Sequence, residues 1–192
     1  MAPLDTETAR TRLLDAAEEL FYASGIQAVG MDAVRAAAGL PLKRVYALYP
    51  AKEQLVEAYL ERRDVEWRAR LAAAVEAVEG PRDRILAVFD WLGSWFREPG
   101  FRGCAWINGF GELGAVSEVV VRQARAHKRA FADYVDGLVA AAGLPARLGP
   151  ELVLLAEGAM VTAGILGTDA PAARARGAAE ALIGERSFSR VL

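Results

Sequence analysis

The side chains that most often perform covalent or metal chemistry are sparse in this sequence of 192 residues, which contains one cysteine and one histidine. A single histidine, His127, with no glutamate three positions before it cannot supply the paired ligands of a zinc or di-iron site. No glycine-rich phosphate loop and no nucleophile with a nearby base is visible in the pattern. The sequence therefore disfavours an enzyme and predicts neither a metal site nor a cofactor.

The two single residues themselves are given ordinary roles. Cys104 is interpreted as a small buried hydrophobe, with thiol sensing as the alternative. His127 is flanked by Arg125, Lys128 and Arg129, and we expect it to be a partly exposed polar residue.

Aromatic residues crowd between positions 89 and 110, more densely than the core of a small helical bundle requires. Asn108 and Glu112 continue a helical stripe that starts at Cys104, with a spacing of four residues. An apolar cavity with a few convergent polar groups is the usual form of a small-molecule site. The predicted ligand-binding residues are Phe89, Leu92, Trp95, Trp106, Asn108, Phe110 and Glu112. The alternative for each ring is ordinary core packing.

Charge gives little direct support for nucleic-acid binding. The formal net charge is −2, and the first sixty residues carry six Lys or Arg against eight Asp or Glu. Contacts to DNA would have to come from a few well-placed cations and backbone amides, with the acidic side chains turned away.

Hydropathy predicts a soluble, cytoplasmic chain with a sizeable core, since 54% of the residues are hydrophobic. The longest uncharged apolar run is shorter than the roughly 18 residues of a membrane span. The first residues lack the basic-then-apolar pattern of a secretory signal, and the single cysteine agrees with a reducing compartment.

Apolar residues recur at helical spacing almost throughout, and strand patterns are absent. We therefore predict an all-α chain of about nine helices, with a three-helix head joined by a long fourth helix to a C-terminal bundle. The predicted helices are 6–23, 31–38, 41–48, 52–78, 81–97, 102–113, 117–142, 149–167 and 171–183. The predicted domains are residues 1–51 and 52–192.

Local residues mark several of these helix ends. Asp5 or Thr6 can cap the first helix, and Gly25 follows its end. Gly39 is a predicted left-handed stop after the second helix. Pro41, with its fixed φ, suits the first position of the third helix.

Residues 25–55 predict a helix, a tight turn at Gly39-Leu40 and a second helix, the helix-turn-helix arrangement that places its second helix in a major groove of DNA. The segment from Gly39 to Glu53 resembles the signature of the TetR family of transcription regulators, with Tyr46 three residues before an aromatic and a Lys-Glu pair opening the fourth helix. The upstream Phe-x-x-x-Gly of that signature is present as Phe21 to Gly25. The resemblance covers residues 8–60.

The resemblance implies a role for each matching position. Tyr46 and Lys52 are expected at phosphates, and Lys43 and Arg44 on the exposed part of the recognition helix, where an arginine can pair with guanine. The predicted DNA-binding residues are Leu42, Lys43, Arg44, Tyr46, Ala47 and Lys52. Val45 and Tyr49 are expected in the core of the head. Pro41 and Ala51 stand where the family usually has a serine cap, which puts the phosphate contacts of those caps in doubt.

The resemblance also implies assembly, because the last two helices of the family form a four-helix dimer interface. Small residues allow close approach there, and a two-fold dimer matches palindromic half-sites. The predicted dimer residues are Gly158, Ala159, Ala163, Gly167, Ala175, Ala179 and Leu182. The alternative is packing within one subunit.

The predicted function is a ligand-responsive regulator, most often a repressor in this family. It would be a homodimer released from double-stranded operator DNA by a small apolar or aromatic effector, without a membrane partner. In the alternative, the head binds DNA and the larger domain is a scaffold or a protein-partner module with no effector.

Overall fold

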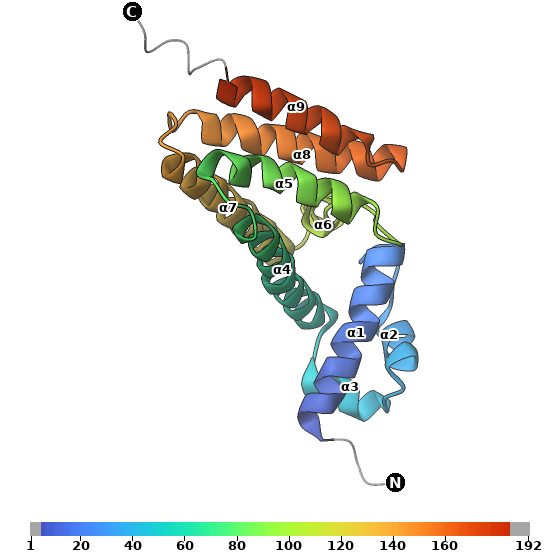
Figure 1. Cartoon of the computed structure of the whole chain (residues 1–192). Helices are drawn as coiled ribbons and strands as arrows, with labels where there is room; N and C mark the ends of the chain where they lie inside the picture. The colour runs from blue at the N-terminus through green and yellow to red at the C-terminus, as the bar shows by residue number, and fades with distance from the viewer. Residues whose placement is uncertain (1–4, 185–192) are drawn as a thin grey trace, which may run out of the picture. The chain divides into compact units, whose positions relative to one another are not determined.

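The computed structural model describes residues 5–184, and within them the chain forms nine α-helices and no strand (Figure 1). The all-α class and all nine predicted helices are confirmed, with ends that differ by at most three residues. The helices are α1 (Thr6–Ser24), α2 (Met31–Ala38), α3 (Leu42–Leu48), α4 (Lys52–Glu76), α5 (Pro81–Phe96), α6 (Ala105–Leu113), α7 (Glu118–Ala141), α8 (Leu148–Leu166) and α9 (Ala170–Gly184).

The helix ends follow from local chemistry. The Asp5 carboxylate accepts the Thr8 backbone N–H at 2.9 Å and the Thr8 hydroxyl at 2.6 Å, so Asp5 is the cap of α1. These hydrogen bonds hold the pKa of the Asp5 carboxyl below its usual value. Gly39 has φ 65° and ψ 32°, which confirms the left-handed stop after α2. Pro41 differs from the prediction: its ψ of 144° is extended, so it precedes α3 instead of starting it.

Contacts divide the described residues into two compact units. The first contains the chain up to Val65 together with Ala105–Arg125, and the second contains Glu66–Cys104 and the chain from Ala126 onward. The predicted boundary after residue 51 separates the helix-turn-helix from the rest of the chain. The first unit is larger than that head, since it also includes α6 and parts of α4 and α7.

In the first unit, α1 packs against α2 and α2 against α3 around an apolar core. The rings of Phe21 and Tyr59 meet edge to face with centroids 5.7 Å apart, which joins α1 to α4. The fully buried aliphatic residues of this core include Leu13, Val34, Val45, Leu55 and Leu60.

In the second unit, α5, α8 and α9 lie side by side (Figure 1). Small residues permit the close approach. A Cβ on Gly93 of α5 would lie 3.3 Å from the Ala172 Cβ of α9, and a Cβ on Gly164 of α8 would lie 3.0 Å from the Gly103 Cα. Larger side chains at these glycines would separate the helices.

Helix α8 is the one described helix that is long and apolar enough to cross a membrane, judged by length and composition only. Buried core helices of soluble proteins pass the same test. Only 39% of its apolar window is buried inside the chain, so α8 leaves apolar side chains on the surface.

Candidate nucleic-acid interface

The turn between α2 and α3 is fixed by its backbone. The Gly39 N–H donates to the Ala36 carbonyl at 3.2 Å and the Leu40 N–H to the Arg35 carbonyl at 3.2 Å. The Leu40 side chain is buried and anchors the turn in the core of the first unit. The chain therefore has the compact helix-turn-helix that the sequence predicts.

Helix α3 has one buried and one exposed face. Val45 within it and Tyr49 just after it are buried, as predicted. Leu42 is 49% exposed and Tyr46 is 45% exposed, and Lys43 and Ala47 are exposed beside them. An exposed face with a cation, a hydroxyl and two small or apolar side chains is what contact with phosphates and base edges requires.

Arg44 is placed differently from the expected exposed position. It is half-buried, and its Nη2 donates to the Thr6 hydroxyl in the first turn of α1 at 3.0 Å. A base contact by Arg44 would need the guanidinium to exchange this hydrogen bond or to use its other donors.

Lys52 is turned toward the loop between α1 and α2, which differs from the expected phosphate contact. Its Nζ donates to the Ile26 carbonyl at 2.6 Å and lies 3.5 Å from the Gln27 carbonyl. Burial lowers the pKa of the Lys52 ammonium, and the negative charge of Glu112 opposes this shift. The physical reason for this placement is that two loop carbonyl oxygens, of Ile26 and Gln27, lie within reach of the ammonium.

The predicted withdrawal of acidic side chains from the DNA-reading face has a structural basis in the first unit. On α4, the carboxylates of Glu53, Glu57 and Glu61 follow one another at a spacing of four residues. They bond to Ser117 at 2.9 Å, Arg122 at 2.6 Å and Gln123 at 3.0 Å, all on or beside α7. These bonds direct the three carboxylates at α7 and the residue that precedes it.

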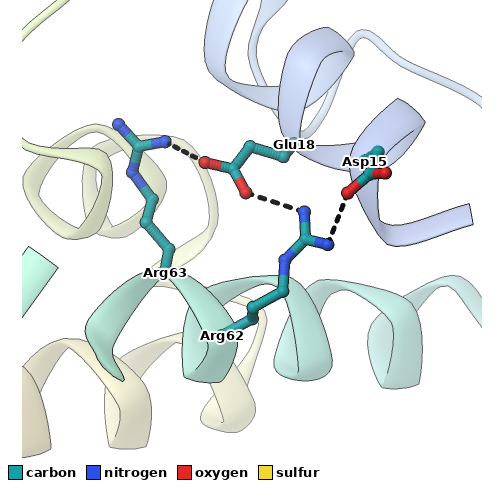
Figure 2. Close-up of polar contacts among 4 residues, drawn as sticks. All are labelled: Asp15, Glu18, Arg62 and Arg63. Atoms are coloured by element: carbon teal, nitrogen blue, oxygen red, sulfur yellow. Dashed lines mark hydrogen bonds and ion pairs between the residues drawn. The ribbon is translucent and has the colours of Figure 1, made fainter. Parts of the chain in front are cut away.

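A second charged cluster, not anticipated from the sequence, joins α4 to α1 (Figure 2). Arg62 donates to Asp15 at 2.7 Å and to Glu18 at 2.8 Å, and Arg63 donates to the other Glu18 oxygen at 2.7 Å. The Arg63 guanidinium also lies 3.9 Å from the ring centre of Tyr22. The Arg-Arg pair and the acidic pair spaced by three residues were visible in the sequence, but nothing there showed that they meet.

The predicted ligand-binding residues are divided between the two units. In the second unit, Phe89, Leu92 and Trp95 are buried in the core. The Trp95 ring stacks on Trp91 with centroids 5.7 Å apart and meets Phe101 edge to face at 5.0 Å. Here the rings contact one another, which is the core alternative that the sequence left open.

Two further residues, Trp67 and His127, complete this ring cluster, and neither is among the predicted ligand-binding residues. Trp67 of α4 contacts four other rings, among them Phe131 at 5.6 Å and His127 at 5.1 Å. His127 is 2% exposed, so the expectation of a partly exposed histidine is wrong. It faces inward because it lies on the face of α7 that carries Phe131 one turn later.

In the first unit, Trp106 is buried, whereas Asn108 and Phe110 are exposed. The Glu112 carboxylate accepts the backbone N–H of Gln27 at 2.8 Å. The structure thus gives Glu112 a partner in the chain itself, where the sequence predicted the polar end of a ligand.

The predicted dimer residues also fall into two groups. Ala159, Ala163, Ala175 and Ala179 are buried inside the chain, where they pack within the second unit. Gly158 and Gly167 are exposed and Leu182 is half-buried. Exposed apolar side chains that the prediction omitted follow α8: Leu154, Val161, Ile165 and Leu166.

In an all-α chain, a helix-turn-helix whose second helix has an exposed face is typical of a DNA-binding regulator. Comparison with known proteins agrees with this class. Residues 13–59 match the family model of bacterial regulatory proteins of the tetR family. SCO4454, a TetR-family transcriptional regulator from Streptomyces coelicolor, is 31% identical with a TM-score of 0.84, over 93% of this chain and 96% of that one.

Two further matches extend this comparison. A TetR transcriptional regulator from Chloroflexus aurantiacus shares the fold with a TM-score of 0.81 at 24% identity, over 93% of this chain and 96% of that one. An uncharacterised HTH-type transcriptional regulator of Mycobacterium tuberculosis is 32% identical over 81 residues, which span 42% of this chain and 40% of that protein. The chain belongs to the TetR family of transcriptional regulators.

The position of Lys52 generates a titration prediction. Its ammonium should release its proton below the ordinary lysine pKa of 10.5. Because the unfolded chain then binds more protons, the free energy of unfolding should rise with pH between the lowered pKa and the ordinary one. Nuclear magnetic resonance of the lysine ε-methylenes, assigned with Lys52→Arg, measures the titration directly.

Glu112→Gln supplies the internal control for this titration. Removing the carboxylate charge should lower the pKa of Lys52 further, because only desolvation remains. A Lys52 resonance that titrates at or above the ordinary value in the unmodified protein would contradict the buried placement.

Proposed function

We propose that this protein is a homodimeric, ligand-responsive repressor that binds a palindromic operator through α2 and α3 and is released by a small apolar or aromatic effector. The observation that carries the proposal is the two-faced α3, whose Leu42, Lys43, Tyr46 and Ala47 are exposed while Val45 is buried. As operator DNA of a bacterial regulator lies in the cytoplasm, we place its action there.

In the proposed complex, α3 enters the major groove. The Tyr46 hydroxyl would donate to a phosphate and Lys43 would contact a phosphate or a base edge. Leu42 and Ala47 are small or apolar enough to approach a thymine methyl. Arg44 would read a base by exchanging its hydrogen bond to Thr6 for one to the base edge. Lys52 is left out of this interface, because its ammonium already serves the loop between α1 and α2.

Dimerisation is proposed through the exposed face of α8 with α9. Leu154, Val161 and Ile165 lie at spacings of seven and four residues, so they share a helix face, and Gly158 and Gly167 lie exposed on or beside the same helix. Exposed apolar patches of this kind mark interaction sites, and a two-fold interface would present two recognition helices to two half-sites. The four buried alanines would support this face from beneath.

One observation favours the alternative in which the C-terminal domain has no effector. The rings of Trp67, Trp91, Trp95 and Phe131 contact one another at centroid distances of 5.1 to 5.7 Å and bury their faces in mutual packing. A filled ring cluster serves a scaffold as well as it serves a sensor. The domain division proposed for these roles is DNA binding by residues 1–51 and sensing and assembly by residues 52–192.

The first prediction for this function concerns DNA. Operator fragments should be obtained by retaining genomic fragments on the protein and sequencing them. Tyr46→Phe should then weaken binding to all sequences alike, because a phosphate contact positions the protein without reading sequence. Arg44→Ala should relax base preference at one position per half-site, by about 1–3 kcal/mol, if its guanidinium leaves Thr6. Glu19→Ala, an exposed change on α1, is the control. An unchanged preference profile in Arg44→Ala would restrict Arg44 to its contact with Thr6.

The second prediction concerns the effector. A panel of small apolar and aromatic compounds should contain at least one that releases the protein from its operator and changes tryptophan fluorescence. An effector acts only through its differential affinity for the two states, and a preference of about a hundredfold corresponds to roughly 2.7 kcal/mol per site. If every compound that changes the fluorescence leaves the protein bound to its operator, the result contradicts the effector proposal and supports the scaffold alternative.

The third prediction concerns assembly. Ile165 is 77% exposed and Leu154 is 72% exposed, so Ile165→Glu or Leu154→Glu should leave the folded subunit intact and bury a charge only in a dimer. Light scattering should show monomers, and operator affinity should fall sharply. Val116→Glu is the control, because it places the same charge at another exposed apolar residue (79% exposed). This variant should remain dimeric. A dimeric Ile165→Glu protein would place the interface elsewhere.

A further inference from the structure

The loop between α1 and α2 covers residues 25–30, and backbone hydrogen bonds join its ends to the two helices, from the Gly25 N–H to the Phe21 carbonyl and from the Ala33 N–H to the Gly30 carbonyl. It starts at Gly25, whose φ is 90°, a conformation that residues with a side chain rarely adopt. Because the loop leads directly into α2, its position influences where α2 and α3 lie against α1. Whatever holds the loop therefore helps to place the DNA-reading face.

The Glu112 carboxylate of α6 holds the donor side of this loop. Its Oε2 accepts the Gln27 N–H at 2.8 Å. It also lies so close to Gly25 that a Cβ there would be 3.0 Å from Oε1 and 3.1 Å from Oε2. Two constraints thus favour glycine at position 25, the positive φ and the approach of the carboxylate. They give a physical reason for the glycine in the Phe-x-x-x-Gly pattern.

Lys52 at the start of α4 holds the acceptor side of the same loop. Its Nζ donates to the Ile26 carbonyl at 2.6 Å, and its positive charge interacts favourably with Glu112. Two consecutive loop residues are therefore held by opposite charges from two helices. Glu112 of α6 accepts the Gln27 N–H, and Lys52 of α4 donates to the Ile26 carbonyl. Charge-assisted hydrogen bonds of this kind are stronger than those between neutral groups.

Apolar packing also holds the loop, since Ile26 and Val29 are both buried. The Ile26 side chain is buried against α6, where a Cβ on Gly109 would lie 3.2 Å from its Cδ1. Beside it is an open groove of about 260 Å³. The groove is lined by Ile26, Gln27, Lys52, Glu53, Val56, Leu113, Ser117 and Val120. The polar contacts of Glu112 and Lys52 add a restraint at the loop backbone between these buried side chains and the groove.

We propose that Glu112 is a positioning residue for DNA recognition, which acts from α6 with Lys52 to fix the loop between α1 and α2 and through it the helix-turn-helix. Glu112 does not contact DNA in this proposal. The inference rests on the proposed function in one respect, that α3 reads the operator. It adds that α6 belongs mechanically to the DNA-binding unit, so any movement of α6 changes the restraint on the loop.

The test compares Glu112→Ala, Glu112→Gln and the control Glu19→Ala in the full chain. Amide hydrogen exchange should be about tenfold faster at residues 25–29 in Glu112→Ala, because the Gln27 N–H loses its acceptor. Affinity for the selected operator should fall about tenfold, whereas affinity for non-specific DNA, which depends on phosphate contacts, should not change. Glu112→Gln keeps an acceptor oxygen, so it should restore most of the loop protection and part of the operator affinity.

The arms of this experiment separate the possible failures. Loop exchange equal to that of the control in both Glu112 variants would overturn the proposal, as would equal losses for operator and non-specific DNA. Should Glu112→Ala fail to fold, the near-isosteric Glu112→Gln decides, since a purely structural residue would show no selective change in operator affinity. If the unmodified protein retains no operator, the proposed function fails, and the exchange comparison still decides whether Glu112 holds the loop.

Discussion

The first half of α4 provides the constraint on which the first unit depends. Leu55, Val56 and Leu60 are buried in its core, and each such burial stabilises the fold by about 1.5–3 kcal/mol. The charged contacts to α1 and α7 are partly exposed pairs that contribute about 0–1 kcal/mol each. Apolar burial therefore supplies most of the stability. The charged contacts to α1 and α7 determine which turn of α4 faces which turn of these two helices.

This division of labour accounts for a DNA-binding head with a negative balance of charge. Asp15 and Glu18 serve Arg62 and Arg63, and Glu53, Glu57 and Glu61 are directed to α7. These five acidic side chains therefore join helices to one another. An exposed α3 with Lys43 and Tyr46 does not require a basic surface overall, because phosphate contacts position the protein through a few groups.

The spacing of the aromatic residues is compatible with two different structures, a lined cavity and a filled core. Rings at helical spacing are equally suited to line a cavity or to fill it, since both need an apolar, inward-facing stripe. In the second unit, Trp67 of α4 meets rings of α5 and α7 edge to face, so these rings pack against one another. Its place could not be read from the crowded segment between residues 89 and 110, which does not contain it.

The sequence by itself determined the all-α class, the nine helices of the described residues and the helix-turn-helix pattern, because these depend on local periodicity, caps and glycines such as Gly39. The resemblance over residues 8–60 added the burial of Val45 and Tyr49 and the exposed face of α3. Only the tertiary structure decided the partners of Arg44, Lys52 and Glu112, which lie 38, 26 and 85 residues away along the chain. Helical periodicity specifies which face of a helix a charged side chain occupies. It carries no information on which distant backbone carbonyl, hydroxyl or N–H will reach that face when the helices pack.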